Sequence, residues 1–389
     1  MELSSARRNC GRLYVGSQLP LGFLPSGKNQ LNMPTIDEIG GTMKCNLKLI
    51  AAAAMTLSLT ACGGGFEANE SPAETGNEEA PAAATAENVY RVSFNQTETH
   101  PQFIALTNLG QRMADATDGK CSLEVFPNET LGNQKDSIEL VQAGTVDFAM
   151  VAGSLLENFN PDFVVFNLPY TFDDKEHQQK VFMDPELTDE LFSSIEDEKI
   201  SVLGAFHAGV RNVYNSEKPI NTPEDLDGMK IRVIESDTNL KMMELMGGSG
   251  TPMGQGEVYT AIQSGVIDGG ENNESIFANL KHFEVAKYYS YTRHLMFPDY
   301  LITNPDLLAN MDPACSDFLK EDMANTQKEQ GELWDKEIEK SIQMAEEAGA
   351  EFNEADVAAF REAVKPLVEE SLTNDFTRDL YAKVREAAN

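Results

Sequence analysis

The chain has 389 residues, and its 63 Asp and Glu outnumber its 30 Lys and Arg, so the formal net charge is −33 at pH 7. This acidic balance argues against nucleic-acid binding, which needs clustered Lys and Arg. The five histidines show no metal-ligand spacing, and the chain has no glycine-rich phosphate loop and no Gly-x-Ser-x-Gly motif. We therefore expect no metal, no cofactor and no enzyme activity.

The first recognisable element is a secretory signal. Lys44 and Lys48 accompany a short apolar run that ends in small residues before Cys62, and this run is too short for a mature membrane span. The sequence around Cys62 resembles a bacterial lipoprotein box, which implies cleavage before this cysteine and diacylglycerol on its sulfur. A chance apolar stretch with a buried cysteine is the alternative. We interpret 43–61 as the lipoprotein signal peptide and 1–42 as a mis-assigned upstream segment, translated from a start codon placed too early.

Residues 62–88 comprise the lipidated cysteine and a linker. Small and acidic side chains dominate this segment, and it has too few large apolar residues to form a core. We expect it to be disordered and to hold the folded body, 89–389, away from a membrane surface. The body is long enough for two lobes. Its Cys121 and Cys315 either form one disulfide outside the cytosol or stay two isolated apolar residues.

The body opens with a strand, a helix and a second strand. Apolar and polar residues alternate over 90–94, and apolar residues then follow helical spacing from Pro101 towards Gly119. A second strand is expected at 122–126. A short return between two such strands predicts a parallel, right-handed unit.

A weak internal repeat favours two lobes of similar build. The stretch VQAGTVD at 141–147 resembles IQSGVID at 262–268, and each predicts a helix that ends at a glycine, followed by a strand with an aspartate. Between the repeats we expect a buried strand and a crossing loop in 161–172. Helices should follow over 173–198, and another strand at 200–206.

The second half of the body predicts short strands and one long helical stretch. Strands are expected at 230–234, 288–291 and 300–303, with a helix at 237–246. Residues 312–348 keep a helical pattern throughout. An unbroken helix of this length would extend about 54 Å and lie across both lobes. A helix broken near Gly331 is the alternative.

Two arginines and one asparagine are candidates for binding a carboxylate. Arg211 and Arg232 bracket one stretch of the sequence, and Asn272 lies in the later stretch DGGENN. Arginine stays charged, and its planar fork matches a carboxylate with two parallel hydrogen bonds. The alternatives are that Arg232 is an exposed strand residue and that Arg211 pairs with an acidic residue at the junction of the lobes. Asn272 could also be a turn residue.

Several motifs together resemble one family, the substrate-binding (DctP-type) subunits of tripartite ATP-independent periplasmic (TRAP) transporters. They are LPY after residue 167, PEDLDGMKIRV, TPMGQGEVYTAIQSGVIDGGEN and the long late helix. The resemblance implies an α/β, two-lobed Venus-flytrap fold of the periplasmic-binding-protein type, with a long helix spanning both lobes. It also implies capture of an organic acid and its delivery to the small and large permease subunits, driven by a sodium gradient.

The same resemblance sets expected lobe boundaries. The first lobe would cover 89–208, with about 296–330 returning to it. The second lobe would cover 209–295, with about 331–389.

Site residues follow from the resemblance, motif by motif. Arg232 matches the arginine that pairs with the substrate carboxylate, and Arg211 matches a second basic contact in the same lobe. Asn272 matches an asparagine that hydrogen-bonds the same group. Asn95 matches a contact from the facing lobe, and its neighbour Gln96 is expected near the mouth of the cleft.

Gln255 suggests the kind of ligand, because it stands where many relatives carry an aromatic residue. A glutamine there favours a hydroxylated partner such as a sugar acid of the uronate type, with a C4-dicarboxylate as the second choice. The sequence thus predicts a monomeric, lipid-anchored receptor, in the periplasm or on the outer face of the cytoplasmic membrane. A secreted two-domain enzyme and a sensory binding subunit are the other classes considered.

Overall fold

The structure is a computed structural model, and it describes residues 86–388. The upstream segment, the signal peptide, Cys62 and nearly all of the linker lie outside these residues, so the predictions made for them are not addressed by the fold. No helix among residues 86–388 is both long enough and apolar enough to cross a bilayer.

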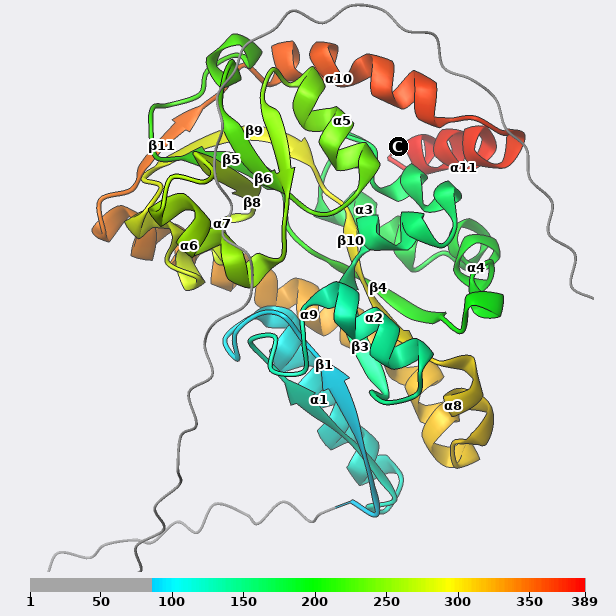
Figure 1. Cartoon of the computed structure of the whole chain (residues 1–389). Coiled ribbons are helices and arrows are strands. Elements are labelled where there is room, and N and C mark those ends of the chain that lie inside the picture. Colours follow the sequence, from blue (N-terminus) through cyan, green and yellow to red (C-terminus); the bar gives the residue numbers. More distant parts are fainter. Residues whose placement is uncertain (1–85, 389) are drawn as a thin grey trace, which may run out of the picture. The chain divides into compact units, whose positions relative to one another are not determined.

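Two separate sheets organise the described chain (Figure 1). We call the halves built on them the first and the second lobe. The first sheet has the order β2 (Cys121–Phe126), β1 (Asn88–Ser93), β3 (Phe148–Ala152), β10 (Pro298–Thr303) and β4 (Ser201–His207). The second has the order β11 (Glu351–Glu354), β9 (Tyr288–Leu295), β5 (Arg211–Asn215), β8 (Gly269–Asn272), β6 (Lys230–Val233) and β7 (Ser249–Pro252).

Helices connect and flank these strands. In chain order they are α1 (Pro101–Ala116), α2 (Gln134–Gln142), α3 (Lys175–Phe182), α4 (Pro185–Ser193), α5 (Asp237–Leu245), α6 (Val258–Gln263), α7 (Glu274–Asn279), α8 (Pro305–Asn310), α9 (Pro313–Glu347), α10 (Val357–Ser371) and α11 (Asp375–Glu386). The expected opening unit is confirmed, because β1 and β2 are parallel and α1 connects them. Pro101 occupies the first turn of α1, where its missing N–H costs no hydrogen bond.

The internal repeat corresponds to one structural device used in both lobes. Gly144 and Gly265 follow the ends of α2 and α6 with positive φ, as a C-terminal cap requires. Asp147 then accepts the backbone N–H of Arg91 in β1 at 2.8 Å. Asp268 likewise accepts the backbone N–H of Lys230 in β6, at 2.7 Å. Each aspartate therefore ties its strand to the parallel neighbour, and the two lobes are built alike at this point.

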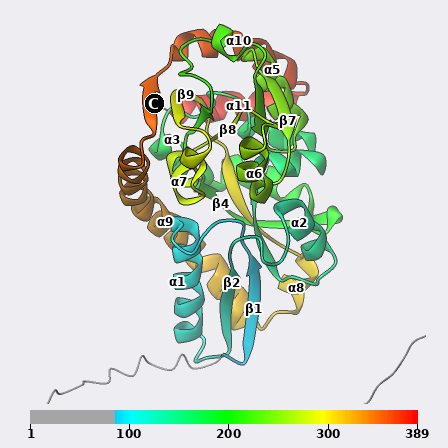
Figure 2. The ribbon, with the colours of Figure 1, turned by 60° about the vertical axis from the view of Figure 1, so that its left-hand side comes forward.

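Helix α9 is continuous over 35 residues, so the alternative of a break near Gly331 is wrong. Its first half packs on α1 and β4 of the first lobe and its second half on α7 of the second lobe, as Figure 2 shows. Gly331 lies against the side chain of Gln179, whose amide end a Cβ atom would displace. The glycine thus serves close packing instead of ending the helix.

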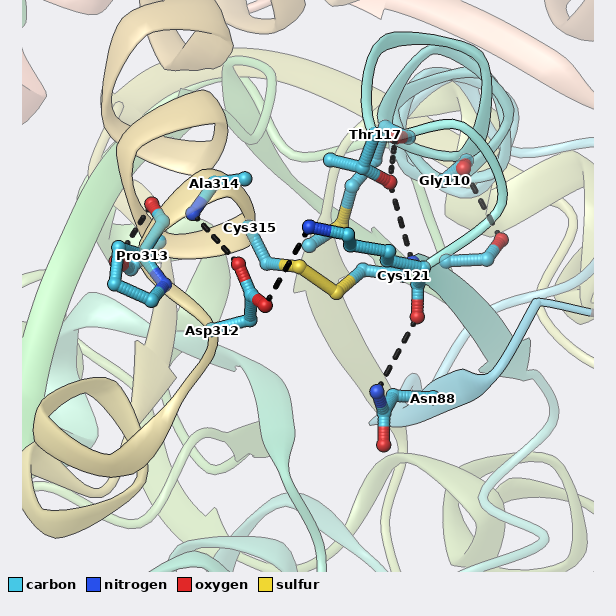
Figure 3. The surroundings of a disulfide bond; sticks show 12 residues. Asn88, Gly110, Thr117, Cys121, Asp312, Pro313, Ala314 and Cys315 are labelled. Carbon is cyan, nitrogen blue, oxygen red and sulfur yellow. Dashed lines mark hydrogen bonds and ion pairs between the residues drawn. A yellow bond between two sulfur atoms is a disulfide. The ribbon is translucent and has the colours of Figure 1, made fainter.

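A disulfide between Cys121 and Cys315 fixes the start of α9 to the first sheet (Figure 3). The two Cα atoms are 6.1 Å apart, within the usual range for a disulfide. Both cysteines are fully buried. The sequence left open whether the two cysteines form a disulfide or stay separate, and in the structure they form the disulfide.

Two connections carry the chain from one sheet to the other, one between β4 and β5 and one between β9 and β10. Pro298 of β10 pairs with His207 at the end of β4, and Leu295 of β9 pairs with Arg211 at the start of β5. These two connections and α9 join the lobes. Both connections end beside the candidate site.

We propose that one lobe boundary lies between β9 and β10, because β9 belongs to the second sheet and β10 to the first. At the C-terminus, however, α11 packs on α4 and on a short 3₁₀ segment, Pro161–Phe166, both of which precede β4 in the chain. The last helix therefore contacts elements from the part assigned to the first lobe.

The expected buried strand in 161–172 is wrong. Residues 161–166 form that 3₁₀ turn instead, with Pro161 in its first turn and Asn160 accepting the N–H of Asp162 as a cap. The apolar pattern correctly predicted that this segment is buried, since Phe163 and Val165 are buried. A short apolar run does not by itself separate a strand from a buried helical segment.

Candidate ligand-binding site

A polar cavity lies where the two sheets face each other, and all six sequence-predicted ligand residues line it. Asn95 and Gln96 come from the segment after β1, and Gln255 comes from the loop after β7. Arg211, Arg232 and Asn272 lie on β5, β6 and β8. The space left within the cavity is about 30 Å³, smaller than the roughly 300–1,000 Å³ typical of small-molecule sites.

The topology explains why these residues meet. In the second sheet β6 and β8 are parallel neighbours, so their carboxyl ends lie at the same edge. Arg232 and Asn272 stand at those ends. In α/β sheets, ligands bind in the crevice outside the carboxyl ends of the strands.

Arg211 has a carboxylate partner within the protein. Its Nε and Nη2 donate to the two carboxylate oxygens of Glu271 at 2.5 and 2.7 Å, and Nη2 also donates to the Glu271 carbonyl at 2.7 Å. Nη1 donates to Asn272 Oδ1 at 3.0 Å. The alternative that Arg211 pairs with an acidic residue is thus realised. One of its five N–H groups has no acceptor in the described part of the chain, and a ligand contact through it stays a prediction.

Glu271 is charged in this pair. Burial alone would raise its pKa, but the charge of Arg211, the nearby His294 and the hydrogen bonds from Arg211 outweigh burial and lower the pKa to about 2. The pair is therefore neutral overall at all ordinary pH values. Both carboxylate oxygens of Glu271 accept from Arg211.

Arg232 has no such partner. Its Nε and Nη2 donate to the Met253 carbonyl at 3.0 and 2.8 Å, and its Nη1 donates to Gln255 Oε1 at 3.3 Å. Within residues 86–388, no carboxylate forms an ion pair with it, although only 4% of its surface is exposed. Burial lowers its pKa from the ordinary value, yet a guanidinium stays protonated. The charges of Glu271 and Glu129 act on it without direct contact, and a buried cation with no ion pair favours an anionic ligand.

Asn272 and Gln255 extend the polar wall beside Arg232. Asn272 is the last residue of β8 and not part of a turn; its Nδ2 donates to Gln255 Oε1 at 3.3 Å. The Nε2 of Gln255 and the Oε1 of Gln96 are buried without a hydrogen-bond partner in the described chain. Because buried polar groups are nearly always paired, these two unsatisfied atoms point to a polar ligand that would complete them.

Sequence reasoning missed several residues that line the cavity. They are Gln134, Asn273, Phe297 and Asp299. Asp299 is the most informative of them, because it is a carboxylate on the first-lobe side. His100 also lines the cavity and is the N-cap of α1, with Nδ1 accepting the N–H of Gln102 at 3.3 Å.

Further contacts join the two lobes. Glu157 follows β3, and its carboxylate accepts from Asn167 Nδ2 at 2.5 Å, Thr238 Oγ1 at 2.6 Å and Ser236 Oγ at 3.2 Å. Ser236 and Thr238 begin α5 in the second lobe. Glu129, in the first lobe, hydrogen-bonds the backbone of Gly256 in the second. The structure therefore has the lobes in contact at these two points.

Comparison with known proteins agrees with this architecture. The family described as bacterial extracellular solute-binding protein, family 7 (DctP) matches residues 92–375. The chain belongs to this family, and it is a TRAP solute-binding subunit, an extracytoplasmic binding protein and not an enzyme.

The 2,3-diketo-L-gulonate-binding periplasmic protein of Escherichia coli K12 is one relative, 30% identical over 299 residues that cover 76% of this chain and 91% of that protein. A TRAP periplasmic solute-binding protein of Anaerococcus prevotii, solved with bound α/β-D-glucuronate, is 38% identical with a TM-score of 0.75, over 77% of this chain and 98% of that one. A similar protein of Xanthobacter autotrophicus, solved with β-D-galacturonate, is 34% identical with a TM-score of 0.73, over 76% and 99%.

Proposed function

We propose that this protein captures a sugar acid of the uronate class and delivers it to the membrane permease subunits of a TRAP transporter. The single observation that carries the proposal is Arg232, a buried guanidinium at a cavity with no carboxylate partner in the described chain. A ligand carboxylate would supply the missing charge through charge-assisted hydrogen bonds. Two relatives of known structure hold uronates, which supports the same ligand class.

The remaining site residues would bind the ligand's hydroxyl groups and complete the carboxylate contact. Asn272 and Arg211 would contribute to the carboxylate end beside Arg232. Gln255 and Gln96 each have one unsatisfied buried atom, and a hydroxyl group can donate to one and accept from the other. Asn95 would contact the ligand from the first lobe.

Capture would involve closure of the lobes. Water leaves as the lobes meet, and the ion pair between Arg232 and the ligand becomes stronger in the drier cavity. The hydroxyls of Ser236 and Thr238 donate to the Glu157 carboxylate across the lobes, so these hydrogen bonds would form or strengthen on closure. The permease would then recognise the closed, loaded receptor.

Calorimetric titration of the purified protein against a ligand panel tests the function. The panel contains D-glucuronate, D-galacturonate, aldonates, C4-dicarboxylates and 2-oxo acids. We expect the tightest binding from a uronate. Tightest binding of a C4-dicarboxylate would replace the ligand class, and binding of no organic acid would reject the proposal.

The protein would act as a monomer attached to the membrane by lipid on Cys62. In a detergent phase-partition assay of cell extracts, we expect the native protein in the detergent phase and Cys62→Ala in the aqueous phase. Equal partition of both would contradict lipidation.

A further inference from the structure

We propose that Asp299 restricts the cavity to acids with a single carboxylate, by accepting a ligand hydroxyl where the second carboxylate of a diacid would lie. This inference rests on the proposed function and sharpens it from organic acids to hydroxylated monoacids. It assigns to Asp299 a role in specificity, separate from the anchoring role of Arg232.

Asp299 is held as an acceptor at the wall of the cavity. It lies in β10, the strand between β3 and β4, and pairs with Ala152 and Phe206. Its Oδ2 accepts from Gln102 Nε2 at 2.9 Å, while Oδ1 has no donor in the described part of the chain. Gln102 is itself fixed, because it is fully buried and its Nε2 also donates to the His207 carbonyl at 3.2 Å. One oxygen of a fixed carboxylate is therefore available to the ligand.

The charges at the cavity wall leave no cation for a second carboxylate. The charged side chains that line the cavity are Arg211, Arg232 and Asp299. Glu271 neutralises Arg211, so Arg232 is the cation left to the ligand. Asp299 forms no ion pair within residues 86–388. A monoacid would match Arg232, whereas a diacid would bring its second negative charge into a cavity that already contains a carboxylate.

The ionisation of Asp299 supports this reading. Burial raises its pKa to about 6, against the opposing effects of the hydrogen bond from Gln102 and the charge of Arg211. Above that value the group is a carboxylate, which only accepts hydrogen bonds. A ligand hydroxyl can donate to it, and a ligand carboxylate cannot.

Three acids with the same carbon skeleton test the proposal. D-galacturonate and D-galactonate are monoacids, and galactarate carries a second carboxylate at the other end of the chain. Dissociation constants are measured by calorimetry at pH 7.5 for the native protein, Asp299→Asn and Asp299→Ser. The control is Asp306→Asn, which removes an exposed carboxylate on α8 and so changes the net charge equally.

We expect the native protein to bind the tighter monoacid at least tenfold more tightly than galactarate. Asp299→Asn should reduce that preference at least tenfold, because the amide accepts from Gln102 and can donate to a carboxylate. Asp306→Asn should leave it unchanged. Asp299→Ser removes the same charge in a smaller side chain and serves if the amide variant does not fold.

The outcomes separate this inference from the proposed function. A native protein that binds galactarate as tightly as the monoacids overturns the inference, and so does an unchanged preference in folded Asp299 variants. In either case binding of the monoacids leaves the receptor function standing. If the native protein binds neither monoacid nor D-glucuronate, the proposed function itself fails.

Discussion

Arg211 and Glu271 form a bidentate ion pair that is almost completely shielded from water, with side-chain exposures of 4% and 1%. Because of this pair, the two arginines at the site have different roles. Arg211 forms an ion pair with a carboxylate of the protein. Arg232 forms no ion pair in the described chain, and the proposed ligand would supply the carboxylate. The first is expected to matter mainly for stability and the second mainly for binding.

Breaking this pair should destabilise the fold strongly. Glu271→Gln leaves the Arg211 guanidinium buried and uncompensated, so we expect the free energy of unfolding to fall by about 3–5 kcal/mol. The control is Glu354→Gln, which breaks the exposed pair with Arg293 and should cost less than about 1 kcal/mol. Urea unfolding measures both, and equal losses would show that burial of the first pair has no special effect.

The disulfide between Cys121 and Cys315 should stabilise the protein, because it closes a long loop. The cysteines are 194 positions apart in sequence, and a disulfide over such a loop is expected to contribute about 2–5 kcal/mol. Thermal unfolding of the double variant Cys121→Ala, Cys315→Ala should show a lower midpoint. Reductant should lower the midpoint of the native protein and not that of the variant. A midpoint shared by the native protein and the variant would mean that the bond adds nothing to stability.

Glu157 should make stability depend on pH. Burial raises its pKa from an ordinary value of 4.5 to about 7, although its hydrogen bonds oppose this. The folded protein therefore holds a proton on Glu157 that the unfolded chain releases earlier. Its contribution to stability is complete below pH 4.5 and is lost as the pH rises to about 7.

The variant Glu157→Gln removes this titration while keeping an acceptor for Thr238. The difference in unfolding free energy, native minus variant, should fall between pH 4.5 and 7.5 and change little outside that range. Other titrating groups are common to both proteins and cancel in the difference. A difference that stays constant or rises with pH would contradict the account.

Local patterns predicted much of the fold. Alternation over 90–94 and the helical spacing after Pro101 are signals that neighbouring residues carry alone, and both elements formed where expected. The repeated helix–glycine–aspartate joint also reported a local geometry, with Gly144 and Gly265 at positive φ. The strand predicted in 161–172 is wrong because an apolar run indicates only that a segment is buried, and both a strand and a 3₁₀ turn can be buried.

The parts of the site that were missed depend on strand order and register. Glu271 meets Arg211 because β5 and β8 are antiparallel and place Asn212 opposite Asn272, and no sequence interval encodes that register. Asp299 reaches the cavity because β10 inserts between β3 and β4, elements from a distant part of the chain. The motif-bearing residues Arg232 and Asn272 were predictable because a family resemblance carried them.

The most direct measurement of the central claim is the calorimetric binding of D-glucuronate or D-galacturonate to Arg232→Ala, with Arg293→Ala as a matched control on the exposed surface. Removing the anchor of a buried charged contact should cost at least about 2 kcal/mol, or roughly 30-fold in the dissociation constant, while the control binds like the native protein. Arg232→Ala binding the uronate as tightly as the native protein would show that this arginine does not hold the ligand.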